Sequence, residues 1–356
     1  MDFVVSARKY RPQVFDTVVG QSSVTDTLSH AIASGQLAQA YLFCGPRGVG
    51  KTTCARIFAK EINKKNAESA ADYAFNIFEL DAASNNSVED IRQLIDQVRI
   101  APQEGKYKVY IIDEVHMLSQ AAFNAFLKTL EEPPAHAIFI LATTEKHKII
   151  PTILSRCQVF DFQRISVKDM ALHLRGIAEK ENVQAEDEAL HLIAEKADGG
   201  LRDALSLFDQ MASACQGKIT YTATIARLHV LDYNYYFKTL ELANAEDISA
   251  LFLLLEEIIA KGFDGHQFLS GLAQHLRNLL LAKDSKTLAL ISVSESVLDT
   301  YKKQAEMFAV PFIFHALDEL SQADVQYKTS KNQRLLLELA LLKLASIGQY
   351  LEKKKS

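Results

Sequence analysis

Short apolar runs alternate with stretches of helical periodicity over the first 165 residues. The runs are rich in Ile, Val, Phe and Tyr, and most of them alternate little within themselves, which is typical of strands covered on both faces. Strands that alternate with helices indicate an α/β domain built on a parallel sheet. The five expected strands are 40–44, 76–80, 108–112, 136–142 and 158–162, with helices between them such as 88–98 and 120–130.

The pattern changes after Arg164 and predicts helices alone. Three short helices follow within about 55 residues and predict a small helical lid. From about residue 231 the periodicity is helical to the end, with leucine stripes that indicate core packing. We therefore expect an α/β domain over 1–164, a three-helix lid over 165–230 and an all-α domain over 231–356.

Composition narrows the class of protein. The 356 residues include only 14 Gly and 7 Pro, which favours a helix-rich fold. The net charge is −5, which excludes a globally basic nucleic-acid coat but not a local basic stripe. No apolar run reaches the roughly 18 residues of a membrane helix, and the N-terminus does not resemble a signal peptide. The four cysteines include no CxxC pair, which favours reduced thiols and a cytoplasmic protein over a disulfide or zinc framework.

The strongest chemical signal is a GxxxxGKT phosphate loop that follows the first expected strand and opens a helix. Its glycines let backbone N–H groups surround a phosphate, and the helix N-terminus adds to the attraction. Lys51 is expected to reach the β- and γ-phosphates, and the Thr52 hydroxyl to bind Mg²⁺. The residues expected to hold the nucleotide phosphates are Gly45, Pro46, Arg47, Gly48, Val49, Gly50, Lys51, Thr52 and Thr53.

Two adjacent carboxylates, Asp113 and Glu114, close the third expected strand. In open α/β sheets ligands bind at this carboxyl edge. Asp113 is expected to hold Mg²⁺ with Thr52, and Glu114 to orient and polarise an attacking water. A phosphate loop and a carboxylate pair of this kind together indicate a nucleoside triphosphatase.

Three further positions are weaker candidates. Thr143 and Thr144 close the fourth expected strand, where a hydroxyl can bond a γ-phosphate or a water, or simply complete a turn. Arg156 precedes the fifth expected strand and is either a surface residue or a finger that stabilises transition-state charge. Arg202 begins a helix and so opposes its dipole, which makes a nearby anion plausible.

These motifs together resemble the AAA+ ATPases, and within them the clamp-loader motor subunits of bacterial DNA polymerase III. Residues 8–12, with Arg11 and Pro12, and residues 19–21, with Val19 and Gly20, resemble that family's pocket for the nucleotide base. The resemblance implies that Thr143 or Thr144 is a first sensor, Arg202 a second sensor and Arg156 a finger that reaches a neighbouring subunit's ATP. The other segments that carry it, in order, are GPRGVGKTT, ELDAASNNSVEDIR, DEVHMLS, LEEPP, ATTE, PTILSRC and GGLRDALSL.

The chain departs from this family at one point. Members usually carry a four-cysteine zinc module between the first helix and second strand, whereas residues 63–72 contain no cysteine and are too few to hold one. We therefore expect ATP and Mg²⁺ as ligands and no zinc. The family's longer forms continue into further tail domains, so the chain corresponds to a short form or a truncated one.

The resemblance implies a fold of an AAA+ α/β domain with a parallel five-stranded sheet, a helical lid and an all-α collar that mediates oligomerisation. It also implies an ATPase that works with wrench and stator subunits in a pentamer and loads a sliding clamp onto primer-template DNA. Phosphate contacts are expected at the helix beginning near Ser87, with Arg92 and Arg99 as added cations, unless this is merely a capped surface helix. The alternatives are another AAA+ loader or remodeller, or a non-catalytic scaffold subunit of the loader.

Overall fold

The computed structural model describes residues 4–64, 76–102, 105–228, 231–291, 293 and 295–353. Its contacts divide the chain into two compact units, residues 1–218 and 219–356, and each is described by itself. The expected α/β domain and most of the expected lid therefore belong to one unit. The division of the chain into three domains remains a prediction.

The first unit is built on a five-stranded parallel sheet. The strand order is β2-β3-β4-β1-β5, so β1 lies between β4 and β5. This order agrees with the expected α/β architecture, and each strand starts and ends within one residue of its prediction. The strands are β1 (Ala40–Cys44), β2 (Ile77–Asp81), β3 (Lys108–Asp113), β4 (Ala137–Thr143) and β5 (Gln158–Asp161).

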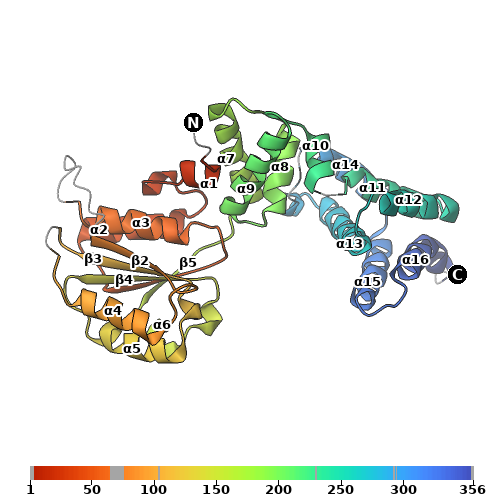
Figure 1. The fold of residues 1–356 in the computed structure, drawn as a ribbon. Helices are drawn as coiled ribbons and strands as arrows, with labels where there is room; N and C mark the ends of the chain where they lie inside the picture. Colours follow the sequence, from red (N-terminus) through yellow and green to blue (C-terminus); the bar gives the residue numbers. More distant parts are fainter. Residues whose placement is uncertain are drawn as a thin grey trace. The chain divides into compact units, whose positions relative to one another are not determined.

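Helices cover both faces of this sheet (Figure 1). Because side chains alternate along a strand, Tyr41 and Phe43 of β1 pack on one face and Leu42 on the other. All three are fully buried, which explains why β1 reads as a continuous apolar run. The helices on the Tyr41 face are α2 (Ser22–Ser34) and α3 (Lys51–Glu61), and those on the Leu42 face are α4 (Val88–Val98), α5 (Gln120–Glu131) and α6 (Pro151–Leu154).

The expectation of strands covered on both faces is wrong for the two edges of the sheet. β2 is half-buried to exposed along its length, and only Phe160 of β5 is buried. Each of these strands pairs with a single neighbour. An edge strand has less cover from the flanking helices, so polar residues such as Glu79 are tolerated there.

Three helices complete the first unit, as the periodicity predicts: α7 (Val167–Lys180), α8 (Asp187–Lys196) and α9 (Leu201–Ala214). Two two-residue strands, β6 (Gln184–Ala185) and β7 (Lys218–Ile219), pair with each other. The expectation of helices alone after Arg164 is wrong at these two points. Each strand follows a residue with positive φ, Asn182 and Gly217, where the chain leaves a helix.

The N-terminal segment is fastened to these helices. In α1 (Ser6–Lys9), the backbone N–H and the hydroxyl of Ser6 both donate to Asp209 of α9. The Tyr10 hydroxyl donates to Glu181, just beyond α7. These bonds place the residues that follow α1 beside the lid helices.

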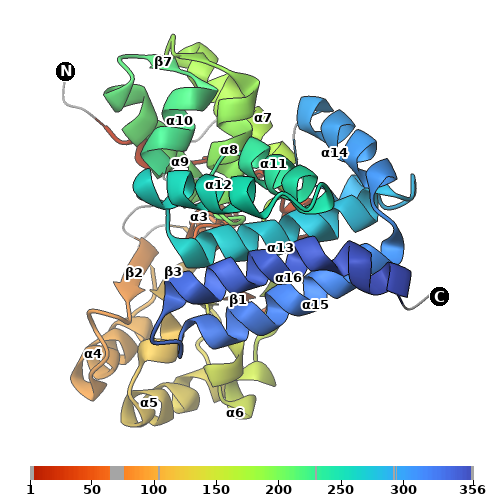
Figure 2. The same cartoon turned by 90° about the vertical axis from the view of Figure 1, so that its right-hand side faces the viewer.

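The second unit is helical throughout the part that the structure describes. Helix α13 packs against α14, α15 and α16, and α11 packs against α12 and α16 (Figure 2). The core is formed largely by leucine and aromatic side chains of these helices. The helices are α10 (Tyr221–Leu228), α11 (Tyr233–Asn244), α12 (Ile248–Ala260), α13 (Gly265–Ala282), α14 (Glu295–Met307), α15 (Val310–Tyr327) and α16 (Gln333–Lys353).

One polar network is buried inside this helical core. The His275 ring is 1% exposed and lies 2.8 Å from the Tyr301 hydroxyl and 2.8 Å from Oε1 of Gln304. Gln304 in turn donates to the carbonyl of Phe237. Every polar atom of the ring has a partner, which is the condition for burying it.

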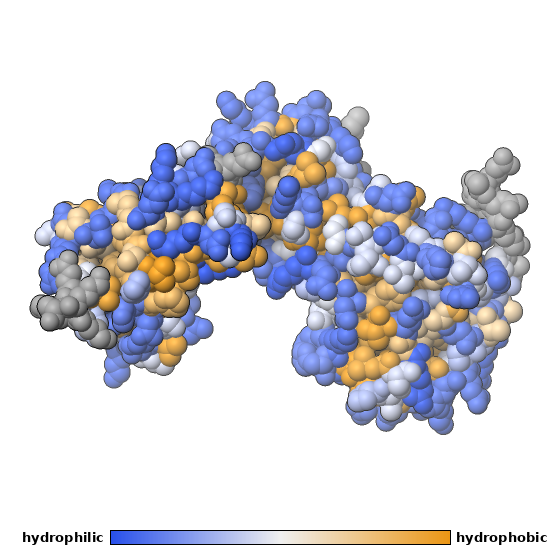
Figure 3. Space-filling view, turned by 180° about the vertical axis from the view of Figure 1, so that it is seen from behind, coloured by the Kyte–Doolittle hydropathy of each residue, from blue (hydrophilic) through white to orange (hydrophobic). Residues whose placement is uncertain are grey.

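Apolar side chains also reach the surface of the second unit among hydrophilic ones on the face drawn in Figure 3. The most exposed are Leu253, Phe314 and Val325, at 72%, 59% and 76%. Within the described residues, no helix combines the length and the apolar character that crossing a bilayer requires.

Candidate nucleotide-binding site

The phosphate loop lies between β1 and α3, as its sequence context predicts, and its backbone needs glycine. Gly45 has a φ of +149°, and a Cβ there would lie 2.5 Å from the carbonyl oxygen of Phe162. Gly48 has a φ of +76°, and its missing Cβ leaves room for the Arg202 side chain. Only glycine meets both demands without strain.

Lys51 opens α3, and its side chain folds back over the loop. Its amine donates hydrogen bonds of 2.7 Å to the carbonyls of Gly45 and Pro46, and the residue is only 6% exposed. Burial lowers the pKa of Lys51, while the neighbouring Glu114 and Asp113 carboxylates act in the opposite direction. The loop thus holds a desolvated cation where a phosphate is expected.

The Thr52 hydroxyl lies against the first carboxylate. It donates a hydrogen bond of 2.7 Å to Oδ2 of Asp113, at the end of β3. Two hard oxygen atoms from the two predicted motifs therefore stand side by side, and such a pair suits Mg²⁺. The donors thus fit the expected ion.

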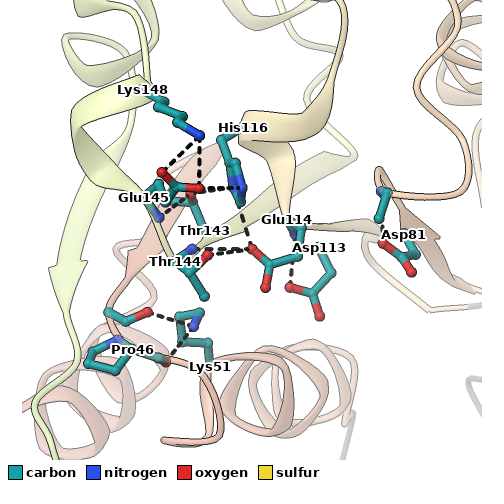
Figure 4. Close-up of polar contacts among 12 residues, drawn as sticks. Pro46, Lys51, Asp81, Asp113, Glu114, His116, Thr143, Thr144, Glu145 and Lys148 are labelled. Carbon is teal, nitrogen blue, oxygen red and sulfur yellow. Dashed lines mark hydrogen bonds and ion pairs between the residues drawn. The ribbon is translucent and has the colours of Figure 1, made fainter. Parts of the chain in front are cut away.

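Glu114 follows Asp113 in a left-handed backbone conformation, with a φ of +48°. Such a conformation is uncommon outside glycine and costs about 1 kcal/mol or more. The backbone N–H and the hydroxyl of Thr144 both donate to Oε2 of Glu114, over 3.3 and 3.0 Å (Figure 4). The carboxylate at the end of β3 is therefore held by the end of β4.

Thr143 has a different environment from Thr144. It is fully buried, and its hydroxyl oxygen accepts from the backbone N–H of Glu145 and lies 3.0 Å from Nδ1 of His116. No role was expected for His116 from the sequence analysis, although it lies two residues after Glu114. The close-up in Figure 4 shows its ring between Glu114 and Glu145.

A cavity of about 170 Å³ lies beside this loop. Its walls come from the N-terminal segment, the phosphate loop, the end of β3 and the first turn of α9. Of the residues expected to bind the nucleotide, Arg11, Pro12, Val19 and the stretch from Arg47 to Thr53 line it, together with Asp113, Glu114 and Arg202.

Several expected residues are not in the lining of this cavity. Gly45 and Pro46 accept hydrogen bonds from Lys51, and Gly20 lines a neighbouring groove. Thr144 donates to the lining residue Glu114, whereas Thr143 contacts His116, which is not in the lining. Sequence reasoning also missed five lining residues. Leu201 and Leu205 stand next to Arg202 and one helical turn beyond it, which is a usable signal. The others, Ala7, Val18 and Ile165, carry no motif of their own, whereas Tyr10 belongs to the segment 8–12 that was expected to form the base pocket.

Arg202 belongs to the lid but touches the phosphate loop directly. Its backbone N–H donates to the carbonyl of Gly48, over 3.3 Å. The pKa of Arg11 is lowered by burial and by the nearby positive charges of Arg56 and Arg202. Arg56 is already paired with Glu79, whereas Arg11 and Arg202 both line the cavity, where they favour a bound anion.

Arg156 is outside the lining of the cavity. Its guanidinium donates to Oε1 of Glu131 and to the carbonyl of Thr152, both over 2.7 Å. Both partners belong to this chain, Glu131 at the end of α5 and Thr152 in the first turn of α6. The side chain is 33% exposed, so it is held at the surface by a salt bridge and a backbone carbonyl.

The start of α4 differs from its expected character as a phosphate site. Ser87 and Asp90 form a capping box, so two of the N–H groups are already bonded, and Glu89 adds a second carboxylate to the first turn. Arg92 and Arg99 lie near Glu89 and Asp96 on their own helix. The structure therefore favours the alternative, a capped surface helix.

Among the described residues, no group of three or more His, Cys, Asp and Glu side chains is placed so that it could hold a metal ion. Cys44, Cys54, Cys157 and Cys215 are all free thiols. Most of the segment that stands where the zinc module is usual, residues 65–72, lies outside the described part of the chain, and the structure does not bear on that expectation.

The strand order, the phosphate loop before α3, the acidic end of β3 and the helical lid define a P-loop domain of the AAA+ class. The fold agrees with this class in a solved structure, the Thermotoga maritima RuvB Holliday junction branch migration motor. That chain is 24% identical, with a TM-score of 0.50, over 65% of this chain and 78% of its own.

Three family descriptions match consecutive parts of the chain. "DNA polymerase III, delta subunit" matches residues 20–166, and "DNA polymerase III clamp loader subunit, ATPase lid domain" matches 169–217. "DNA polymerase III subunits gamma and tau domain III" matches residues 222–356.

Relatives that match nearly the whole of this chain indicate the same family. The DNA polymerase III subunit gamma of Buchnera aphidicola is 34% identical over 98% of this chain and 98% of its own length. The subunit tau of Bacillus subtilis is 39% identical over 97% of this chain and 63% of its own length. The chain belongs to the gamma/tau family of DNA polymerase III subunits. It spans somewhat less than two thirds of the longer relatives such as that of Bacillus subtilis.

Proposed function

We propose that this chain is the ATP-driven motor subunit of a DNA polymerase III clamp loader. In this proposal, its ATP binding and hydrolysis drive the loading of a sliding clamp onto primed DNA during replication. The observation that carries the proposal is the hydrogen bond from Thr52 to Asp113 beside the buried Lys51 amine. Membership of the gamma/tau family supports the assignment of this ATPase to a clamp loader.

The phosphate end of the site follows from these contacts. Lys51 exchanges its two loop carbonyls for phosphate oxygens, and loop N–H groups surround the β-phosphate. Thr52 and Asp113 hold Mg²⁺, which neutralises phosphate charge when bound. Glu114 leaves Thr144 to orient a water toward the γ-phosphate, and the freed Thr144 hydroxyl, with Thr143 behind it, senses that phosphate.

The base end lies between the N-terminal segment and the lid. Pro12 and Val19 provide apolar surface for a base, and Arg11 and Arg202 provide charge for the phosphates. Arg202 moves with α9, so a bound phosphate draws the lid toward the loop. Arg156 acts at the neighbouring subunit's ATP, which agrees with its place outside this chain's own cavity.

We propose the same partners that the resemblance implies. They are wrench and stator subunits in a pentamer, the sliding clamp, and primer-template DNA bound through the assembled complex. The helical second unit serves as the collar, and its exposed Leu253, Phe314 and Val325 supply apolar surface for neighbouring subunits. The division into domains at 1–164, 165–230 and 231–356 and the location in a reducing cytoplasm are part of this proposal; four free thiols support the latter.

A non-catalytic scaffold subunit would not need a complete hydrolytic set, and the contacts of Lys51, Asp113 and Glu114 speak against it. Another kind of AAA+ remodeller would differ from a clamp loader in what stimulates its ATP turnover. The test is ATP turnover by the chain assembled with its loader subunits. Clamp and primer-template DNA together are expected to raise turnover, and stimulation by a protein substrate instead would contradict the proposal.

A further inference from the structure

His116 lies between two carboxylates that come from different elements. It belongs to the short helix η3 (Val115–Met117), directly after β3, and its side chain is 6% exposed. Nδ1 lies 3.4 Å from Oε2 of Glu114 and 3.0 Å from the Thr143 hydroxyl. Nε2, on the opposite edge of the ring, lies 3.2 Å from Oε1 of Glu145.

The directions of these hydrogen bonds follow from Thr143. Its hydroxyl oxygen already accepts the backbone N–H of Glu145, so its own proton is available for Nδ1 of His116. Nε2 then carries the ring proton and donates it to Glu145. This tautomer, inferred from the network, gives each ring nitrogen a partner. It also turns an Nδ1 lone pair toward Oε2 of Glu114, the same oxygen that accepts from Thr144. A lone pair and a carboxylate oxygen repel each other, so this edge of the ring keeps the carboxylate against its Thr144 donors.

We propose that His116 is a positioning residue that sets where the Glu114 carboxylate rests, and that its tie to Glu145 fixes the ring for this purpose. The inference rests on the proposed function, because it concerns the water that Glu114 activates. Glu145 is itself held by Lys148, through hydrogen-bonded ion pairs, and His147 lies 3.5 Å from its second oxygen. Three elements, η3, the end of β4 and the segment before α6, thereby define one place for the ring.

A buried ring that merely filled space would not need these contacts. Phenylalanine has nearly the same shape, but it would leave the Thr143 hydroxyl without its acceptor and Glu145 without one donor. Glu114 would then lose the repulsion that keeps its carboxylate against Thr144, on a backbone in the left-handed region. A carboxylate that is free to move by an ångström loses much of its power to orient a water.

Three substitutions at His116 separate the two edges of the ring. His116→Asn keeps an amide near the position of Nδ1, His116→Gln keeps one near Nε2, and His116→Phe removes both. We expect His116→Phe to lower kcat for ATP about tenfold in the assembled loader, with ATP affinity within about twofold of wild type. The Asn and Gln variants should each recover part of the loss.

Glu145→Gln tests the contact between Nε2 of His116 and the Glu145 carboxylate. If Glu145 acts through the ring, the double variant His116→Phe, Glu145→Gln should lose no more activity than His116→Phe alone. The matched control is Lys146→Gln, which removes an exposed ion pair with Asp161 next to Glu145 and should keep wild-type kcat. If the Phe variant does not fold, the Asn, Gln and Glu145→Gln variants carry the same test.

Wild-type kcat in the His116 variants would overturn the inference, as would independent losses that add in the double variant. A parallel fall of ATP affinity, kcat and melting temperature would overturn it as well, because that pattern marks a merely structural residue. Lys51→Ala, measured alongside, keeps the two proposals apart. Full turnover in that variant contradicts the proposed function, whereas loss there with unaffected His116 variants contradicts only the role of His116.

Discussion

The hydroxyl of Thr52 donates a 2.7 Å hydrogen bond to Oδ2 of Asp113, across 61 residues of sequence. The contact exists because β1 and β3 are both parallel strands that end at the same edge of the sheet, with β4 between them. The phosphate loop and the acidic strand end are therefore parts of one site. At this edge of the sheet, the effect of a substitution depends on two things. One is the partner that the side chain has in this structure, and the other is the partner that it would gain when ATP binds.

Lys51→Ala should abolish tight ATP binding, because the loop loses the cation that faces the phosphates. The fold should survive, since burial lowers the pKa of Lys51 and the fold therefore gains little from its charge. Equilibrium binding of a fluorescent ATP analogue and a thermal melt without nucleotide check both parts. Lys60→Ala, at an exposed position on the same helix, is the control. Wild-type ATP affinity in Lys51→Ala would refute the assignment.

Glu114→Gln should keep ATP affinity and lose about 10²-fold or more in turnover, because the amide keeps the shape but is a poor base. The amide oxygen can still accept from Thr144, so the resting geometry is preserved. Single-turnover hydrolysis in the assembled loader, beside a binding titration, makes the measurement, with Glu132→Gln as the control. A loss of affinity equal to the loss of turnover would assign Glu114 to nucleotide binding instead.

The sequence predicted the sheet because its strands are continuously apolar runs between helical periods, and β1, β3 and β4 confirm it. It overestimated the burial of β2 and β5, because the apolar content of a run does not say which strand lies at an edge. It also missed β6 and β7, which are only two residues long and depend on a turn at Asn182 and at Gly217. A strand of two residues is too short to show the alternation by which strands are recognised in a sequence.

The site was predicted where a motif requires a particular residue type, as at Lys51 and Asp113. It was missed where a position needs only shape: Ile165 and Val18 line the cavity because distant segments meet there. His116 shows a third case. Its partners, Thr143 and Glu145, lie 27 and 29 residues away, and only the pairing of β3 with β4 brings them together.

The buried network in the helical unit predicts a specific pH dependence. Burial lowers the pKa of His275 from 6.5 to about 4, so the unfolded chain binds a proton between these values that the folded chain does not. Stability is therefore complete above pH 6.5 and falls as the pH drops through this range, by about 2 kcal/mol at pH 5 for this group. Below pH 4 both states are protonated, so the loss of stability from this group stays constant at its full size.

His275→Gln tests this, because glutamine does not titrate. Urea unfolding at pH 7.5 and at pH 5 should show a smaller pH-dependent loss of stability in the variant than in wild type. His147→Gln, at an exposed histidine, should keep the wild-type difference. Equal losses in wild type and His275→Gln would mean that another group causes the pH dependence.

Arg156 gives the prediction that joins assembly to chemistry. Its guanidinium rests on Glu131 and on the Thr152 carbonyl and does not line this chain's cavity. A guanidinium is permanently charged and its fork matches phosphate oxygens, so it can complete a site on a neighbouring subunit. Arg156→Ala should then leave the chain's own ATP affinity within about twofold and lower hydrolysis in the adjacent subunit, by up to about 10³-fold.

Mixed assemblies provide the decisive measurement for Arg156. Arg156→Ala chains and Lys51→Ala chains are each expected to be inactive in the assembled loader. Mixing the two places some intact phosphate loops beside intact fingers, so part of the turnover should return. Glu131→Gln, which removes the carboxylate on which Arg156 rests and leaves the arginine itself intact, should keep turnover in an unmixed assembly. If the wild-type chain alone, at nanomolar concentration, already hydrolyses ATP at the rate of the full complex, Arg156 does not act on a neighbour, because no neighbour is then present to receive it.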